Sequence, residues 1–248
     1  MILGVIPARM GSSRFPGKPL ARLNGKPMIE HVYERSARCR VLDRVVVATP
    51  DEAIAEAVRG FGGDTVMTAS SHVRATDRVA EAAQLIGGDL VVMIQGDEPM
   101  VQPDMIEAAI APVAQDAEIF CTNLIESITA VEEFTDPHTI KVVTDQRGNA
   151  LFFSREPIPN VAHQGFAGIR AYKQVCVIAF RRNQLQAFTT LKPTPLEQAE
   201  SIDMLRVLEH GYTIRLVETP YRTHAVDTPE DLELVEHAMA IHPIVQVP

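Results

Sequence analysis

Cysteine is scarce in this sequence, and long hydrophobic runs are missing. The three cysteines, Cys39, Cys121 and Cys176, are widely spaced and form no C-x-x-C pair. An odd, scattered set favours free thiols in a reducing compartment over a disulfide framework. No run approaches the roughly 18 apolar residues of a membrane-spanning helix, and the N-terminal segment lacks the basic start of a signal peptide. We therefore expect a cytoplasmic protein with no membrane partner.

Basic residues are also in short supply. The chain has 23 Lys and Arg against 32 Asp and Glu, and its net charge is −9. Proteins that wrap nucleic acid usually have the opposite balance, so we expect no nucleic-acid partner. A nucleotide remains a possible ligand, because a local basic loop can bind it against an acidic background. The hydrophobic share of 46% and the charged share of 22% exclude wholesale disorder.

No proline- or serine-rich linker and no internal repeat divides the 248 residues. In the first half, apolar runs that favour strands alternate with patterns that favour helices. The expected strands cover residues 2–6, 44–48, 65–67 and 90–95. A helix is expected to follow the second strand, with Asp51 as its cap. Such alternation is typical of a parallel sheet whose strands are joined by helical crossovers.

The second half has a different pattern. Residues 139–144 and 149–154 flank a short turn and predict a β-hairpin. A further strand is expected near residues 172–180. Residues 195–210 predict one helix that ends at Gly211.

These patterns together predict the fold class. We expect one α/β domain over residues 1–248, with a mainly parallel, Rossmann-like sheet flanked by helices. An antiparallel insertion is expected at about 135–200. The tail from about 242 to 248 has no periodic pattern and is expected to be loose.

The loop after the first strand concentrates positive charge in an acidic protein. Residues 7–19 read PARMGSSRFPGKP and contain Arg9, Arg14 and Lys18. Four small residues lie among these cations, namely Gly11, Ser12, Ser13 and Gly17. Small residues let the backbone approach an anion and point N–H groups at it. The loop is therefore a candidate triphosphate cradle, and the alternative is a solvated loop of turn residues.

Two common nucleotide-binding motifs are missing. A Walker A loop fits badly, because five residues rather than four separate Gly11 from Gly17, and Pro19 stands where Ser or Thr would hold magnesium. The sequence also contains no G-x-G-x-x-G, so a dinucleotide fold has no support. An ATP-using phosphotransferase is kept only as an alternative.

The loop resembles the signature of the cytidylyltransferases that activate 3-deoxy sugar acids, the 3-deoxy-manno-octulosonate (Kdo) cytidylyltransferases. Sugar-1-phosphate nucleotidyltransferases have a related loop with paired glycines, where this chain has Pro7-Ala8. Further matching blocks follow in order along nearly the whole chain, at residues 24–29, 95–99, 140–143, 151–155, 158–159, 195–197 and 226–232. The resemblance implies a nucleotidyltransferase fold, CTP as nucleotide donor, Mg²⁺ and a homodimer.

The resemblance also implies individual roles. Asp97 and Asp227 match the family's magnesium ligands, and Mg²⁺ prefers one or two carboxylates plus phosphate oxygens. With Arg9 and Lys18, which would neutralise triphosphate charge, they are the predicted catalytic residues. Taken alone, Asp97 could equally be a turn residue and Asp227 a helix N-terminal residue.

The predicted nucleotide site departs from the family pattern at one point. In residues 72–78, Arg74 and Ala75 replace a Ser-Gly pair that helps to hold the cytidine in relatives. Arg74 is either an extra anion contact or a solvent-facing side chain. The predicted nucleotide-binding residues are Ala8, Arg9, Gly11, Ser12, Ser13, Arg14, Lys18, Arg74, Thr76, Arg78 and Gln95.

The predicted acceptor pocket departs further. Gln174 and Ile178 stand where the family has His and Tyr, and Asp203 and Met204 stand where it has a Glu-Gln pair. Arg155 keeps its place and could clamp an acid group through paired hydrogen bonds. The predicted acceptor-binding residues are Gln95, Arg155, Gln174, Ile178, Asp203 and Met204.

The sequence therefore predicts a CTP-dependent cytidylyltransferase that forms a CMP conjugate of an anionic acceptor and releases pyrophosphate. A Kdo-type sugar acid is the family template. The lost hydroxyl-binding groups predict that plain Kdo is a poor substrate. The alternative acceptors are a Kdo variant with altered hydroxyls and a small phosphonate acid such as phosphonoformate. A catalytically inactive nucleotide-binding protein is the alternative from another class.

Overall fold

The computed structural model describes residues 1–11 and 15–241. The predictions for residues 12–14 and for the tail at 242–248 lie outside these described residues. Within the described ranges, no helix is both long enough and apolar enough to cross a membrane.

Two compact units make up the chain. The first contains Met1–Glu107 and Arg222–Pro248, and the second contains Ala108–Tyr221. The antiparallel insertion predicted at about 135–200 falls within the second unit. The single domain over the whole chain stays a prediction.

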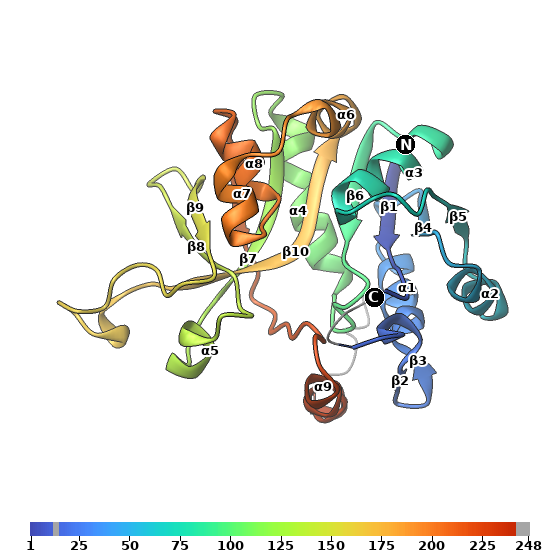
Figure 1. Ribbon diagram of the computed structural model, residues 1–248, viewed down its shortest axis with the longest axis horizontal. Coiled ribbons are helices and arrows are strands. Elements are labelled where there is room, and N and C mark those ends of the chain that lie inside the picture. Colours follow the sequence, from blue (N-terminus) through green and yellow to red (C-terminus); the bar gives the residue numbers. More distant parts are fainter. Residues whose placement is uncertain (12–14, 242–248) are drawn as a thin grey trace. The chain divides into compact units, whose positions relative to one another are not determined.

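Parallel strands form the sheet of the first unit, in the order β6-β1-β4-β5 (Figure 1). Their bounds are Ile2–Pro7 for β1, Arg44–Thr49 for β4, Thr65–Met67 for β5 and Leu90–Ile94 for β6. The predicted strands are thus confirmed to within one residue. Val5 pairs in register with Val46 on one side and Met93 on the other, and all three are buried. Burial of consecutive strand residues is typical of a parallel sheet covered on both faces.

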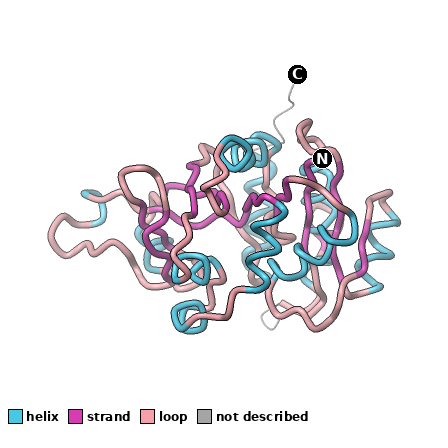
Figure 2. Tube along the Cα trace, turned by 90° about the horizontal axis from the view of Figure 1, so that it is seen from above, coloured by secondary structure: helices cyan, strands magenta, loops and turns pink. Residues whose placement is uncertain are grey.

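Helices pack against these strands, and Figure 2 distinguishes them in cyan from the strands in magenta. Their bounds are Met28–Ala37 for α1, Glu52–Gly60 for α2 and Ala75–Ile86 for α3, while Val235 of α9 (Pro229–Ile241) packs in an apolar cluster with Leu23 and Met28. Helix α4, Pro103–Gln115, runs across the boundary between the two units. In α3, Thr76, Val79, Ala80 and Ala83 are buried at helical spacing, so one stripe of the helix faces the sheet. Three shorter elements are η1 at Lys18–Leu20, β2 at Arg22–Leu23 and β3 at Lys26–Pro27.

The second unit is mostly antiparallel. Strand β10 (Tyr172–Arg181) pairs with β7 (Cys121–Ser127) and with β8 (Lys141–Thr144). Strand β8 also pairs with β9 (Ala150–Ser154), which confirms the predicted hairpin, while β11 (Ile214–Glu218) lies parallel to β7. Helices α5 at Val131–Thr135, η2 at Phe166–Gly168 and α6 at Arg182–Thr190 also belong to this unit. The predicted fold class, a mainly parallel sheet flanked by helices with an antiparallel part, is confirmed.

The single helix predicted at residues 195–210 is wrong. The segment forms two short helices, α7 at Pro195–Glu200 and α8 at Met204–Glu209. Ser201 between them has a φ of 56°, in the left-handed region that ends a helix. Ile202 and Leu205, three residues apart, are both buried, so the apolar spacing of a helix continues past this break and concealed it in the sequence.

Candidate active site

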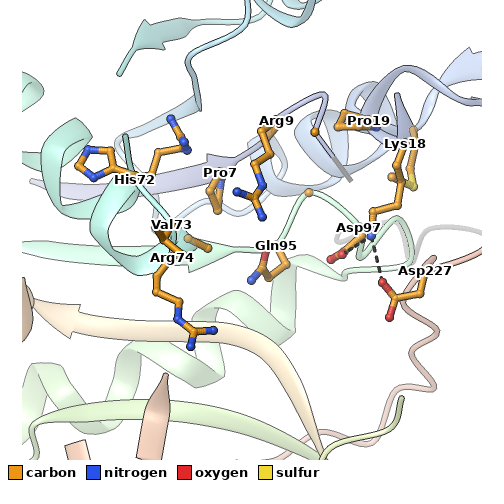
Figure 3. A pocket seen from close by; sticks show the side chains of 16 residues that line it. Pro7, Arg9, Lys18, Pro19, His72, Val73, Arg74, Gln95, Asp97 and Asp227 are labelled. Atoms are coloured by element: carbon orange, nitrogen blue, oxygen red, sulfur yellow. Dashed lines mark hydrogen bonds and ion pairs between the residues drawn. The ribbon is translucent and has the colours of Figure 1, made fainter. Parts of the chain in front are cut away.

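A pocket opens at the carboxyl ends of β1 and β6 in the first unit. Strand β1 lies between β4 and β6, so the chain leaves β1 toward one side of the sheet and returns on the other. Such a switch in strand order creates the crevice in which α/β proteins bind ligands. The cavity has a volume of about 320 Å³ and is lined by residues of the loops that follow these two strands (Figure 3).

The pocket gathers most of the predicted nucleotide-binding residues. Those that line it are Ala8, Arg9, Gly11, Lys18, Arg74, Arg78 and Gln95. Thr76 is fully buried in α3, where its hydroxyl donates to the sulfur of Met93, and it does not line the pocket. Ser12, Ser13 and Arg14 lie outside the described residues. Nucleotide contact by each of these side chains stays a prediction.

Lys18 joins the two predicted metal ligands. Its Nζ donates to Asp97 Oδ2 at 2.7 Å and to Asp227 Oδ1 at 3.2 Å (Figure 3). It also donates to the carbonyl of Val226 at 2.7 Å. The Lys18 side chain is 12% exposed, and those of Asp97 and Asp227 are 26% and 27% exposed. Burial alone would lower the pKa of Lys18, but the two carboxylates outweigh it and hold that pKa above its usual value. Lys18 is therefore charged at neutral pH.

A backbone hydrogen bond brings the two aspartates together. The N–H of Val226 donates to the carbonyl of Asp97 at 2.9 Å, which ties the segment after β6 to the segment before α9. Asp231 then fixes the second segment, because its Oδ2 accepts from the N–H groups of Asp227 and Thr228. Burial would raise the pKa of Asp231, but these hydrogen bonds outweigh it and lower that pKa. Asp227 is thus held by its backbone, and its carboxylate faces Lys18.

Gly96 allows β1 and β6 to end close together. A Cβ at this position would lie 3.1 Å from the carbonyl oxygen of Pro7 and 3.3 Å from Ile29 Cδ1. Both distances are tighter than ordinary van der Waals contact, and the first involves backbone. Glycine therefore keeps Asp97 next to the loop that follows β1.

The loop after β1 is anchored at its stem. The N–H of Met10 donates to Asp51 Oδ2 at 2.8 Å, and the carbonyl of Met10 accepts from the N–H of Gly17 at 3.1 Å. Gly17 has a φ of 75°, a left-handed conformation that glycine adopts without strain, and η1 begins at the next residue. Asp51 is the N-cap residue of α2, as predicted, but its carboxylate makes no cap hydrogen bond to the helix. It holds the loop stem instead.

The arginines of the pocket differ in their partners. Arg9 is exposed. Arg78 is buried, and its Nη1 donates to Thr68 Oγ1 at 2.5 Å and to the carbonyl of Ala69 at 3.1 Å. Burial, followed by the charge of Arg9, lowers the pKa of Arg78. Nearby, His72 Nε2 lies 2.5 Å from Glu81 Oε2. Arg78 thus supports the wall of the pocket with hydrogen bonds of its own.

The donor set suits magnesium. Among residues 1–11 and 15–241, no group of three or more His, Cys, Asp and Glu side chains could hold a metal ion. Two carboxylates, which Asp97 and Asp227 supply, are the usual protein contribution to a Mg²⁺ site completed by substrate phosphates and water. The residues present therefore fit that ion.

The second unit contains every predicted acceptor-binding residue except Gln95. Ile178 and Met204 are fully buried there. The amide of Gln174 donates to Asn123 Oδ1 at 2.6 Å, and Asp203 precedes α8. Acceptor contact by these residues stays a prediction.

Arg155 is already engaged within the second unit. Its Nε donates to the carbonyl of Glu200 at 2.9 Å, and its Nη1 donates to the carbonyl of Pro137 at 3.2 Å. Its backbone N–H donates to Glu200 Oε2 at 2.9 Å. The predicted clamp on an acid group would therefore compete with these contacts.

Several residues at the pocket were not predicted as site residues. Asp51 holds the loop, and His72, Val73, Gly96 and Met28 line the cavity. Asp51 follows the carboxyl end of β4, the strand next to β1. A position at the ligand-binding edge of the sheet could have indicated a site role for Asp51. The preference of Asp for helix caps favoured the other interpretation.

Comparisons with known proteins identify the family. The chain matches the family model described as Cytidylyltransferase over residues 3–216. This chain is a member of the cytidylyltransferase family. Two curated relatives named 3-deoxy-manno-octulosonate cytidylyltransferase come from Geobacter metallireducens and Syntrophobacter fumaroxidans. They are 48% and 49% identical over 243 residues, which cover 94% and 96% of this chain and 96% and 97% of theirs.

Solved structures agree with this cytidylyltransferase assignment. One, described as CMP:2-keto-3-deoxy-manno-octonic acid synthetase complexed with CTP, has a TM-score of 0.89 and 41% identity, and the match covers 97% of this chain and 98% of that one. A 4-diphosphocytidyl-2C-methyl-D-erythritol synthase from Anaerococcus prevotii, at a TM-score of 0.63 and 12% identity over 96% and 98% of the two chains, shares the fold alone. The cytidylyltransferase is therefore a nucleotidyltransferase enzyme, as predicted, and the phosphotransferase and inactive alternatives are not favoured.

Proposed function

We propose that this cytidylyltransferase transfers the cytidylyl group of CTP to a Kdo-type 3-deoxy sugar acid and releases pyrophosphate. One observation carries the proposal: Asp97 and Asp227 meet in a pocket with Arg9 and Lys18, in a chain about half identical to named Kdo cytidylyltransferases. The phosphonate alternative draws no support from these relatives. The homodimer and the cytoplasmic location stay predictions.

In the proposed reaction, a hydroxyl oxygen of the acceptor attacks the α-phosphorus of CTP. The new P–O bond forms as the bond to pyrophosphate breaks, and the hydroxyl proton is lost to solvent. Protein groups mainly position the reactants and neutralise charge in such a transfer. Arg9 and Lys18 would bind the triphosphate, and the N–H of Gly11 would donate to it.

Asp97 and Asp227 would hold magnesium. When bound, Mg²⁺ neutralises phosphate charge and lowers the pKa of a coordinated hydroxyl. Gln95, which lines the pocket beside Asp97, would hydrogen-bond the ribose or the acceptor. Arg74 would add an anion contact.

The side chains predicted to bind the acceptor determine how fast Kdo is expected to react. Gln174 supplies an amide where relatives supply an imidazole, while Ile178 and Met204 are buried and offer no hydrogen bond. Each lost partner of a buried hydroxyl costs about 1–3 kcal/mol. We therefore expect Kdo to react at a rate below that of a pocket with the family's polar groups, and Gln174→His to raise that rate.

The decisive experiment follows pyrophosphate release with Mg²⁺ and identifies the product by mass. Reactions contain CTP with Kdo or with phosphonoformate, and ATP with Kdo. The proposal expects CMP-Kdo from the first reaction and little turnover in the others. Efficient turnover of phosphonoformate alone would reject the acceptor, and turnover of ATP without CTP would reject the nucleotide.

A further inference from the structure

All three N–H donors of the Lys18 ammonium have acceptors within the protein. They are one oxygen of Asp97, one oxygen of Asp227 and the carbonyl of Val226, at 2.7, 3.2 and 2.7 Å. An ammonium has only three donors. In this arrangement Lys18 has no donor left for a phosphate.

Lys18, Asp97 and Asp227 all line the pocket. The carboxylates keep about a quarter of their side-chain surface exposed, so a cation from solvent can reach them. Mg²⁺ coordinates oxygen at about 2.0–2.1 Å and demands octahedral geometry. An ammonium hydrogen-bonded to both carboxylates would repel a dication brought to that position.

The proposed function nevertheless asks for both interactions, a carboxylate-bound cation and a phosphate-bound Lys18. A lysine side chain reconciles them, because its four-carbon stem is flexible and can carry Nζ several ångström with little backbone movement. Lys18 follows Gly17 at the start of the short helix η1, close to the anchored loop stem. A phosphate in the loop would offer Nζ an alternative anionic partner.

We propose that Lys18 and a divalent cation compete for Asp97 and Asp227, and that the triphosphate resolves the competition by drawing Lys18 away. The cation then binds weakly to the protein alone and tightly once nucleotide is present. This rests on the metal role of the two carboxylates in the proposed function. It gives Lys18 a task beyond charge neutralisation, which is to couple cation binding to nucleotide binding.

Mn²⁺ binding to the full, nucleotide-free chain tests the competition. Free Mn²⁺ is measured by electron paramagnetic resonance for the wild type and for Lys18→Met. The variant should bind Mn²⁺ at least about tenfold more tightly, because it removes a positive charge in contact with both carboxylates. Lys26→Met is the matched control, since Lys26 pairs with Glu30 and Glu34 away from the pocket lining. Its Mn²⁺ affinity should equal that of the wild type.

Lys18→Gln gives a second, polar variant in case Lys18→Met does not fold. Equal or weaker Mn²⁺ binding by the folded Lys18 variant would overturn the proposal. Adding Asp97→Asn to that variant should abolish the tight binding, and tight binding that persists would place the cation elsewhere and also overturn it. Pyrophosphate release from CTP and Kdo by the wild type is measured separately, so loss of the proposed function would not be confused with loss of the competition.

Discussion

The two units place their ion pairs in different surroundings. In the first unit, Lys18, Asp97 and Asp227 line a cavity and keep part of their surface exposed. In the second unit, Arg206 forms a two-point pair with Glu197, at 2.8 and 2.5 Å, and both side chains are buried. The Arg206 guanidinium also lies 4.5 Å from the centre of the Phe188 ring.

Lys141 extends the contrast. It is fully buried in the second unit, where its Nζ donates to the carbonyls of Asp136, Thr139 and Arg155. Burial lowers its pKa, and Lys141 is not among the residues that line the pocket of the first unit. Lys18 and Lys141 each satisfy three donors, but only Lys18 does so with carboxylates at a pocket. Both residues are lysines, so residue type does not separate them. The partners and the exposure of the ammonium group decide whether it can exchange partners, as at Lys18, or fixes the fold, as at Lys141.

The largest effect is expected on stability, when the buried pair of Arg206 and Glu197 is broken. Arg206→Met should lower the free energy of unfolding by about 3–5 kcal/mol, because it leaves Glu197 buried without its partner. Urea unfolding measures the loss. Arg59→Met, which breaks an exposed pair with Glu52, should cost less than about 1 kcal/mol. Equal losses in the two variants would contradict the comparison.

Removing a pocket carboxylate should act on turnover instead. Asp97→Asn and Asp227→Asn should each lower kcat by more than about 100-fold, roughly 2.7 kcal/mol, by removing metal stabilisation of developing charge. Pyrophosphate release gives kcat, and thermal unfolding checks the fold. Asp116→Asn, an exposed change, is the control. Near-normal kcat in either pocket variant would remove that residue from the metal site.

A smaller effect is expected at Asp51. Asp51→Ala should raise KM for CTP about tenfold with little change in kcat, because the N–H of Met10 loses a charged acceptor and the loop stem loses its anchor. Asp51→Asn keeps an oxygen acceptor and should restore most of the affinity. Glu52→Ala, the neighbouring exposed residue, is the control. If KM for CTP rose as much in Asp51→Asn as in Asp51→Ala, the charge of Asp51 rather than its hydrogen bond to Met10 would explain its effect on CTP binding.

The smallest effect concerns pH. The folded-state pKa of Asp231 is lowered from 3.8, so its ionised form stabilises the fold above that value and the contribution is lost as pH falls through the folded-state pKa. Asp231→Asn should therefore reduce the loss of stability seen in urea unfolding between about pH 5 and pH 2. Asp64→Asn, at an exposed pair with Arg44, should leave that slope unchanged. If the dependence of stability on pH were the same in Asp231→Asn and the wild type, the Asp231 carboxylate would not stabilise the segment that carries Asp227.

Local patterns predicted the parallel strands well. The runs at Arg44–Thr49 and Leu90–Ile94 are shorter than a typical helix and rich in β-branched or apolar residues, which favours buried strands. The break at Ser201 could not be predicted, because a single left-handed residue leaves the apolar period unchanged.

The sequence could predict those members of the candidate site that lie in recognisable family motifs. Lys18, Asp97 and Asp227, which matched family motifs, are far apart in sequence and lie in contact in one pocket, while their roles stay predictions. Hydrogen-bond partners were not predictable. The sequence could not tell that Asp51 holds Met10 or that Arg155 donates to backbone carbonyls, because both depend on where other segments lie.

Gly96 limits how this pocket could be re-engineered for other substrates. Any side chain there would press on the backbone of Pro7 and push the end of β6 away from β1. Asp97, the next residue, would move with it and lose its spacing to Asp227. A mutant library aimed at new acceptors or nucleotides gains nothing from position 96. The productive diversity lies on the open rim, where Val73 is 75% exposed and can change without moving a strand.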